Sequence, residues 1–386
     1  MYLLASLDEY NDTTKSILVN YNYKNVLHVF NRFSIQNGYE LDVVLALYEK
    51  AMYLFQAICK CDADTANHLL LTGIICRLRK ELENIFLIDG LEKYHDTTLK
   101  IYIHGSMAAL SLAETRDLYA NNFHRNRSLF QLIIQSVLRA NYFEELFKNT
   151  KLDIVDQELN DLQGLISICL ECFHTFIRKA DPIWATYFMY PLKQKDCKLL
   201  YWMFKYITNE DTIEIIRWHC LRIIYQLLSD KIPLNVKFLV DNGLLDVCLS
   251  RWQSAEYNLT TQLEGKLIIF IFSCLIGTEY DVTKKVNILN VICEGLSSVL
   301  SQLRLASIIY INEVIESGDV ECIKHLLCYN DDQIMKNLIK CISNNNNSQQ
   351  EINQLIQNLH LLLVSPDSKS TFMSIIKQKL KQYDLL

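Results

Sequence analysis

The chain has 386 residues, half of them hydrophobic and only four of them proline, so it has enough apolar side chains to build a substantial core. Its formal net charge of −6 disfavours non-specific binding to DNA or RNA, which usually needs a strongly basic domain or stripe. The N-terminus lacks the basic region of a signal peptide, and the longest apolar run, within residues 267–276, is about half of the ~20 residues that a membrane span requires.

Thirteen cysteines are present, an odd number, and most of them lie within apolar helical patterns, as do Cys220, Cys248, Cys274 and Cys293. A set of structural disulfides would be expected in a small secreted domain, where cysteines pair in even numbers. We therefore interpret these cysteines as reduced core residues of a cytoplasmic or nuclear protein.

Apolar side chains at helical spacing recur along almost the whole chain. Residues 1–38 predict N-terminal capping helices that end at Asn37-Gly38. An array of helices is predicted from residue 39 to residue 343, and its first part consists of the ranges 41–61, 63–88, 97–112, 128–147, 157–177, 184–207 and 212–229. No stretch alternates as a β-strand would, so we expect an all-α fold.

The clearest unit follows at residues 233–276 and predicts three helices, over 233–242, 244–251 and 260–276. Pro233 suits the first turn of a helix, and Gly243 suits the left-handed turn that ends one. The third helix is apolar on all sides and therefore needs to be buried between neighbouring helices.

A second copy is predicted over 282–294, 296–302 and 303–317, with Gly295 as the break that corresponds to Gly243. The ranges 320–327 and 332–342 complete the array. The Asn-rich residues 344–350 predict an exposed loop, and residues 351–386 predict C-terminal capping helices.

The segment VDNGLLDVCL (residues 240–249), followed by a long apolar helix, resembles the armadillo repeat, in which a helix ending in Gly precedes two further helices. The segments NVICEGLSSVL (290–300) and SGDVECIKHLL (317–327) look like further copies. This resemblance covers about residues 211–343 and implies an armadillo- or HEAT-like α-solenoid of irregular helical repeats, with a period of roughly 40–47 residues.

Armadillo proteins that bind nuclear-localisation peptides carry Trp and Asn four residues apart on the third helix. The matching positions in this chain hold Phe270 and Cys274 in one unit and Arg222 and Gln226 in the preceding unit. None of the four tryptophans has Asn four residues later. The resemblance therefore does not extend to that activity.

The cluster most similar to a metal site is Cys169, Cys172 and His174. Two thiols three residues apart share one face of a helix, but His174 points to a different side, so we expect buried structural cysteines and no metal or other cofactor. Motifs of phosphate loops, dinucleotide-binding turns, zinc proteases and α/β-hydrolases are missing from the sequence. We therefore expect a protein that is not an enzyme.

Two groups of residues are candidates for partner binding. One is an aromatic segment, because Tyr and Trp combine large apolar area with a polar group and dominate interface hot spots; it contains Trp184, Tyr187, Tyr190, Tyr201, Trp202 and Tyr206. The alternative, that these rings fill a junction between two halves of the array, stays open. The other group is a polar stripe on the predicted helix 212–229, formed by His219, Arg222 and Gln226.

We therefore expect a scaffold or adaptor that binds a peptide or a helix of a protein partner along the concave face of the solenoid. The alternatives are a subunit of an obligate multiprotein complex, or a helical-repeat protein that binds nucleic acid, which the net charge disfavours.

Overall fold

A computed structural model describes residues 39–59, 74–85, 91–115, 123–149, 156–179, 189–193, 199–317, 319–330 and 332–343, with isolated positions at 24, 28, 29, 32 and 381. These residues form helices and the turns between them, with no β-strand, which confirms the all-α prediction for this part of the chain. The chain divides into two compact units, Met1–Trp202 and Met203–Leu386. Apart from isolated positions, the expected capping segments and the Asn-rich loop lie outside the described residues.

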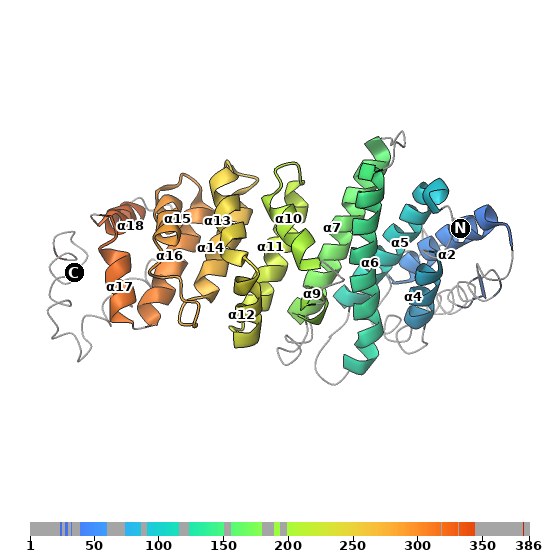
Figure 1. The fold of residues 1–386 in the computed structure, drawn as a ribbon, viewed down its shortest axis with the longest axis horizontal. Coiled ribbons are helices and arrows are strands. Elements are labelled where there is room, and N and C mark those ends of the chain that lie inside the picture. Colours follow the sequence, from blue (N-terminus) through green and yellow to red (C-terminus); the bar gives the residue numbers. More distant parts are fainter. Residues whose placement is uncertain are drawn as a thin grey trace, which may run out of the picture. The chain divides into compact units, whose positions relative to one another are not determined.

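The first unit is organised around one central helix. Its elements are α2 (Leu41–Cys59), α4 (Ile74–Ile85), η4 (Leu91–Tyr94), α5 (His95–Thr115), α6 (Phe123–Asn149), α7 (Asp156–Lys179) and α9 (Tyr190–Lys193). Helix α5 packs against α2, α4, α6 and α7 (Figure 1). The buried Tyr102 of α5 donates a hydrogen bond to the carbonyl of Leu82 at 2.7 Å, and its ring lies 6.0 Å from that of Phe143. Tyr102 thereby ties three of the helices together.

The cysteines of α7 pack against the same central helix. Cys169 Sγ lies 3.4 Å from Ser106 Oγ, and the thiol of Cys172 donates to the carbonyl of Ser106 at 3.4 Å. Both cysteines and His174 are buried. Burial raises the pKa of Cys169 to about 12, so its thiol stays protonated at neutral pH. The interpretation of these cysteines as core residues is confirmed, and it holds also for Cys220, Cys248 and Cys274, whereas Cys293 is half-buried.

The second unit consists of two rows of helices. Its elements are α11 (Glu214–Leu228), α12 (Pro233–Asp241), α13 (Leu244–Ser254), α14 (Gln262–Cys274), α15 (Val286–Ser297), α16 (Ser301–Glu316), α17 (Val320–Leu327) and α18 (Gln333–Ser343), and α10 (Leu199–Thr208) spans the boundary with the first unit. Helices α11, α14 and α16 pack side by side in one row, and α13, α15 and α18 form the other (Figure 1). Contacts between α15 and α16 and between α13 and α14 join the rows.

Two residues near the start of the second unit have the structural roles predicted from the sequence. Pro233 occupies the first turn of α12, and Gly243 makes the turn between α12 and α13 with a φ of +96°. The apolar run of α14 is buried between its neighbours, with Ile268, Ile269 and Phe272 fully covered. The three-helix prediction for residues 233–276 is therefore confirmed.

The predicted break at Gly295 is wrong. Helix α15 continues through this residue to Ser297, and residues 298–300 form a short connection to α16 instead of a helix. Gly295 is buried where α15 meets α14 and α16, and a Cβ there would collide with Ser307 Oγ and lie 3.2 Å from Ile269 Cδ1. This glycine therefore permits close helix packing and makes no turn.

A buried cluster of charges connects three helices of the second unit. Arg217 Nε of α11 donates to Glu264 Oε1 of α14 at 3.0 Å, while Nε and Nη2 of Arg251 on α13 donate to Glu264 Oε2 at 2.9 and 2.8 Å. Glu264 is fully buried, and both arginines are nearly so. Arg217 also donates to the backbone carbonyl of Thr212. Because all three charges are removed from water, the two arginines and the carboxylate depend on one another for charge compensation.

We predict that Gly295→Ala lowers the free energy of unfolding by about 1–3 kcal/mol, because the added methyl group overpacks the contact between α15 and α16. Gly164 of α7 is the matched control: a Cβ there meets no atom within 4 Å. Gly164→Ala should leave stability unchanged or raise it by up to about 1 kcal/mol. Urea unfolding followed by circular dichroism measures both. Adding Ser307→Ala to Gly295→Ala should recover part of the loss, and equal stability of the two single variants would contradict the packing role.

Glu264→Ala should lower the free energy of unfolding by about 3–5 kcal/mol, because it leaves two buried guanidinium groups without their carboxylate. Asp241 serves as control, since it is half-exposed and pairs with Lys237 at 3.5 Å. Asp241→Asn should change stability by less than about 0.5 kcal/mol. If chemical denaturation finds the Glu264 variant as stable as the Asp241 variant, the cluster does not hold these helices together.

Candidate partner-binding face

One side of the row formed by α11, α14 and α16 is only partly covered, and we call it the binding face. Apart from the adjacent Tyr225 and Gln226, its side chains are spaced three or four residues apart on each helix, so they share one side of the row. They are Ile215, Trp218, Arg222, Tyr225 and Gln226 on α11, Leu263, Lys266 and Phe270 on α14, and Gln302, Leu305, Ile309 and Glu313 on α16. The opposite sides of these helices are buried, which fixes the orientation of the face.

Aromatic rings and cations alternate across this face. The guanidinium of Arg222 lies 4.1 Å from the ring centroid of Trp218, one helical turn earlier. The rings of Tyr225 and Phe270 lie 5.7 Å apart and connect α11 to α14. Lys266 Nζ lies 5.5 Å from the centroid of Phe270 and donates to Gln302 of α16 at 2.9 Å. The face is thus a continuous strip from α11 to α16.

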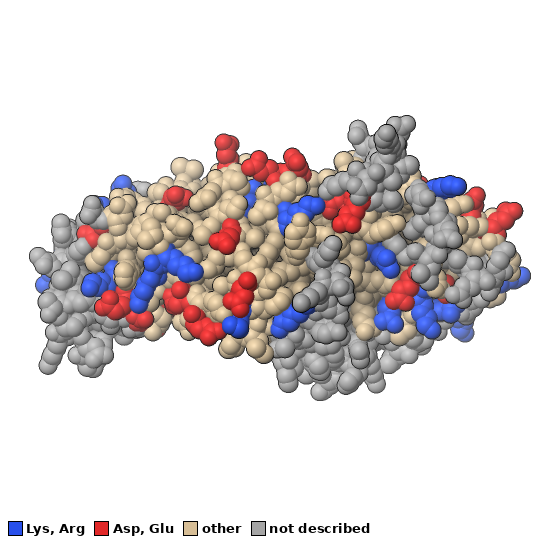
Figure 2. Space-filling model, viewed as in Figure 1, with Lys and Arg blue, Asp and Glu red and all other residues tan. Residues whose placement is uncertain are grey.

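Charge is not uniform over the second unit. The cations of the binding face lie on α11 and α14, whereas Glu313 on α16 pairs with Lys231 at 3.8 Å. Figure 2 shows basic and acidic side chains interspersed over the visible side of this unit, with no continuous basic stripe there. A partner would therefore meet cations on α11 and α14 and, at α16, a carboxylate that is paired with Lys231.

The residues of the aromatic segment predicted as a site differ in how far the structure exposes them. Trp184 and Tyr187 lie outside the described residues, and Tyr190 begins the short helix α9. On α10, Tyr201 is 65% exposed, Trp202 is half-buried and Tyr206 is buried. Of these rings, Tyr201 is available to a partner and Tyr206 contributes to the core. Partner binding by this segment stays a prediction.

His219 has the helical spacing of Arg222 and Gln226 on α11 but, unlike them, it is buried. Only 2% of it is exposed, and its Nδ1 has no hydrogen-bond partner among the described residues. Burial, together with the smaller effect of the charge of Arg222, lowers the pKa of His219 to about 4. The prediction of a solvated polar stripe is therefore wrong at His219, because spacing alone does not show which residues of a helix face neighbouring side chains cover.

Sequence reasoning identified Arg222 and Gln226 but missed the other members of the binding face, among them Trp218, Lys266 and Phe270. The spacing of Trp218 and Arg222, four residues apart, was a signal that they share a face. The resemblance to the armadillo repeat singled out the position of Phe270, but its place within an apolar run predicted burial. Its partial exposure depends on where α11 and α16 pack.

Comparisons with known proteins provide no relative: no protein-family model matches the sequence, and no curated protein matches it. No helix in the described ranges is long and apolar enough to cross a membrane. Across the same residues, no group of three or more His, Cys, Asp and Glu side chains is placed to hold a metal ion. The function must therefore be argued from the binding face itself.

The buried His219 predicts a pH dependence. Between about pH 6.5 and pH 4 the unfolded chain binds a proton at this residue that the folded chain does not, so stability should fall as the pH is lowered through this window. The slope from one such proton approaches about 1.4 kcal/mol per pH unit. His219→Gln should show a flatter dependence than wild type between pH 6.5 and pH 5 in urea unfolding. His325→Gln, which changes an exposed histidine of α17, should keep the wild-type slope, and equal slopes for all three proteins would contradict the prediction.

Proposed function

We propose that this protein is an armadillo-like α-solenoid that acts as a non-catalytic scaffold or adaptor, with a peptide or helix of a protein partner bound along the binding face. The observation that carries the proposal is the strip of Trp218, Arg222, Tyr225, Phe270 and Lys266 across α11 and α14. Aromatic residues and arginine are the side chains that most often dominate the energy of protein interfaces.

The packing of the second unit supports the proposed solenoid. The helices of one row begin at residues 214, 262 and 301, and those of the other begin at 244, 286 and 333. Within each row, the starts of successive helices are therefore separated by a similar number of residues, as a helical repeat requires. Row-by-row packing leaves one side of each row without a covering helix, and this side is where repeat proteins bind extended ligands.

The chemistry of the binding face specifies what a partner must offer. Ile215 and Leu263 are each 42% exposed and lie beside the aromatic rings, so apolar side chains of a partner can be buried there. Arg222 and Lys266 attract a carboxylate of that partner. An amphipathic helix or an extended segment with apolar anchors and at least one acidic residue meets both requirements.

Two further parts of the proposal follow from particular observations. The exposed Ile215 and Leu263 also favour the alternative of a subunit in an obligate complex, because permanent interfaces are more apolar than transient ones. The described cysteines form no disulfide and most of them are buried, which supports a location in the cytoplasm or nucleus, where thiols stay reduced.

A crosslinking experiment tests the proposed binding face. Phe270 is replaced by the photoreactive residue benzoylphenylalanine in tagged full-length protein, which is produced in its own cells, irradiated and purified after nuclease treatment and a high-salt wash. We expect one or two proteins, identified by mass spectrometry, to be crosslinked from position 270. Adding Arg222→Glu and Lys266→Glu should reduce this product by about tenfold or more, the range seen for interface hot spots.

Leu234 provides the matched control, since it is 60% exposed on α12 and is not part of the binding face. The photoreactive residue at position 234 should give little of the product obtained from position 270. Equal products from both positions would contradict the assignment of the face. Recovery of only nuclease-sensitive material would contradict the scaffold function and favour a nucleic-acid binder.

A further inference from the structure

A groove of about 520 Å³ lies on the other row of the second unit, between α13 and α15. Its volume falls in the range of about 300–1,000 Å³ that is typical of ligand sites. The residues that define its chemistry are Trp252, Gln253, Tyr257, Asn287, Asn290 and Glu294, and we call it the Glu294 groove. It shares no residue with the binding face.

An aromatic corner and a carboxylate meet in this groove. The indole Nε1 of Trp252 donates to Glu294 Oε2 at 2.6 Å, which holds the carboxylate beside the ring. The ring of Tyr257 lies 4.8 Å from that of Trp252 at an angle of 45°. Trp252 is only 7% exposed, so its position is set by packing before any ligand arrives.

Local structure holds Tyr257 in place. The side chain of Asn258 accepts hydrogen bonds from the backbone of Thr260 and Thr261 at 2.8 and 3.2 Å, which fixes the turn before α14. Gly265 of α14 leaves room for the ring, because a Cβ there would lie 3.0 Å from Tyr257. The corner is therefore preorganised, and ordering it on binding costs little entropy.

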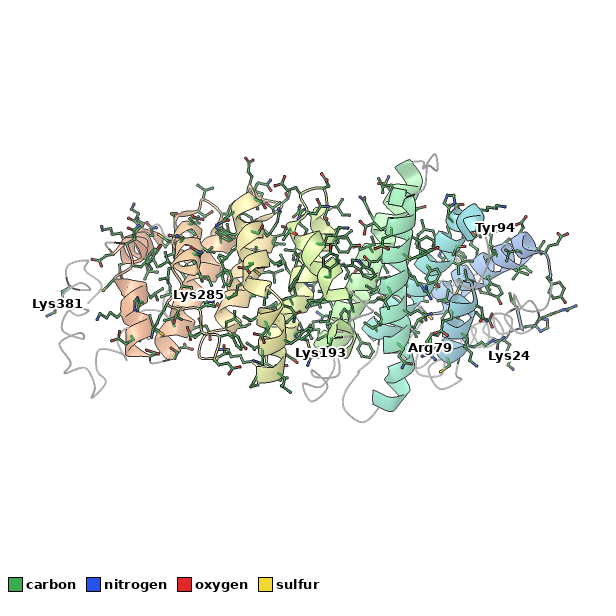
Figure 3. The ribbon with its side chains drawn as sticks, in the orientation of Figure 1. Lys24, Arg79, Tyr94, Lys193, Lys285 and Lys381 are labelled. Atoms are coloured by element: carbon green, nitrogen blue, oxygen red, sulfur yellow. The ribbon has the colours of Figure 1, made fainter. Side chains whose placement is uncertain are left out.

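The charge on the lining of the Glu294 groove is negative. Glu294 is the one charged residue among the described residues that line it. Lys285, the N-cap residue of α15 labelled in Figure 3, is outside the lining, and Arg251 is bound to the buried Glu264. Asn287 and Gln253 add amide carbonyls that accept hydrogen bonds. A cationic group with several donors complements this lining.

We infer that the Glu294 groove binds an arginine side chain presented by an exposed segment of a protein partner. A planar guanidinium stacks on Trp252 or Tyr257 while it donates to the carboxylate and to neighbouring carbonyls, which a lysine ammonium does less well. The groove is larger than a single guanidinium, so residues next to the arginine are accommodated as well. This site goes beyond the proposed binding face and does not depend on it, because the two share no residue.

The test uses full-length protein labelled with 5-fluorotryptophan, in which the ¹⁹F resonance of Trp252 is assigned from a Trp252→Phe variant. The probe is N-acetyl-arginine amide, and its matched control is N-acetyl-citrulline amide, which has the same shape without the charge. We expect a saturable shift of the Trp252 resonance with the arginine probe and binding of the citrulline probe that is weaker by about fivefold or more, as for loss of a partly exposed ion pair.

Glu294→Gln separates charge from structure, because the glutamine carbonyl can still accept the hydrogen bond of Trp252. This variant should bind the arginine probe about fivefold more weakly. Glu279→Gln, which removes an exposed carboxylate outside the groove, should bind it like wild type. Equal affinity for arginine and citrulline, or no effect of Glu294→Gln, would overturn the inference, and equal affinity for N-acetyl-lysine amide would overturn the choice of a guanidinium. A result of either kind leaves the proposed function untouched, because the binding face is tested by crosslinking at position 270.

Discussion

The second unit depends on one buried interaction, the cluster of Arg217, Glu264 and Arg251. A carboxylate without water must have its cations close by, so α11, α13 and α14 have only one arrangement in which all three side chains are satisfied. Both candidate surfaces are positioned by it. Trp218 follows Arg217 on the binding face, and Trp252 follows Arg251 in the Glu294 groove.

The charged cluster fixes the rotation of α14 about its own axis, which the apolar core does not. Helix α14 is apolar on nearly all sides, and a helix of this kind packs with similar energy in several rotations. Glu264 removes that freedom because only one rotation brings its carboxylate to both arginines. Desolvation of three charges offsets much of their attraction, so the gain is mainly a unique structure. Phe270 is held beside Tyr225 for this reason.

Local features of the fold could be predicted from the sequence, and long-range ones could not. Helical periodicity located most of the helices, and the positive φ at Gly243 followed from its place after a helix. The two glycines show what the sequence cannot decide. Gly243 makes a turn, whereas Gly295 permits a close helix contact, and this difference becomes clear only from the position of Ser307 beside Gly295. His219 was expected to be solvated because its burial depends on neighbouring side chains that its spacing does not reveal.

The cluster of Arg217, Arg251 and Glu264 could not be predicted from the sequence for a related reason. Arg217, Arg251 and Glu264 are distant in the sequence, and each has the character of a solvated helix residue until the rows pack. Packing also fixes the side chains next to them, since Trp252 is held by Glu294 and Arg222 lies over Trp218. Binding energy depends on such preordered side chains more than on contact area, because a ligand then loses little affinity to ordering the site. The buried charges of Arg217, Glu264 and Arg251 therefore lie next to the side chains that define both candidate surfaces.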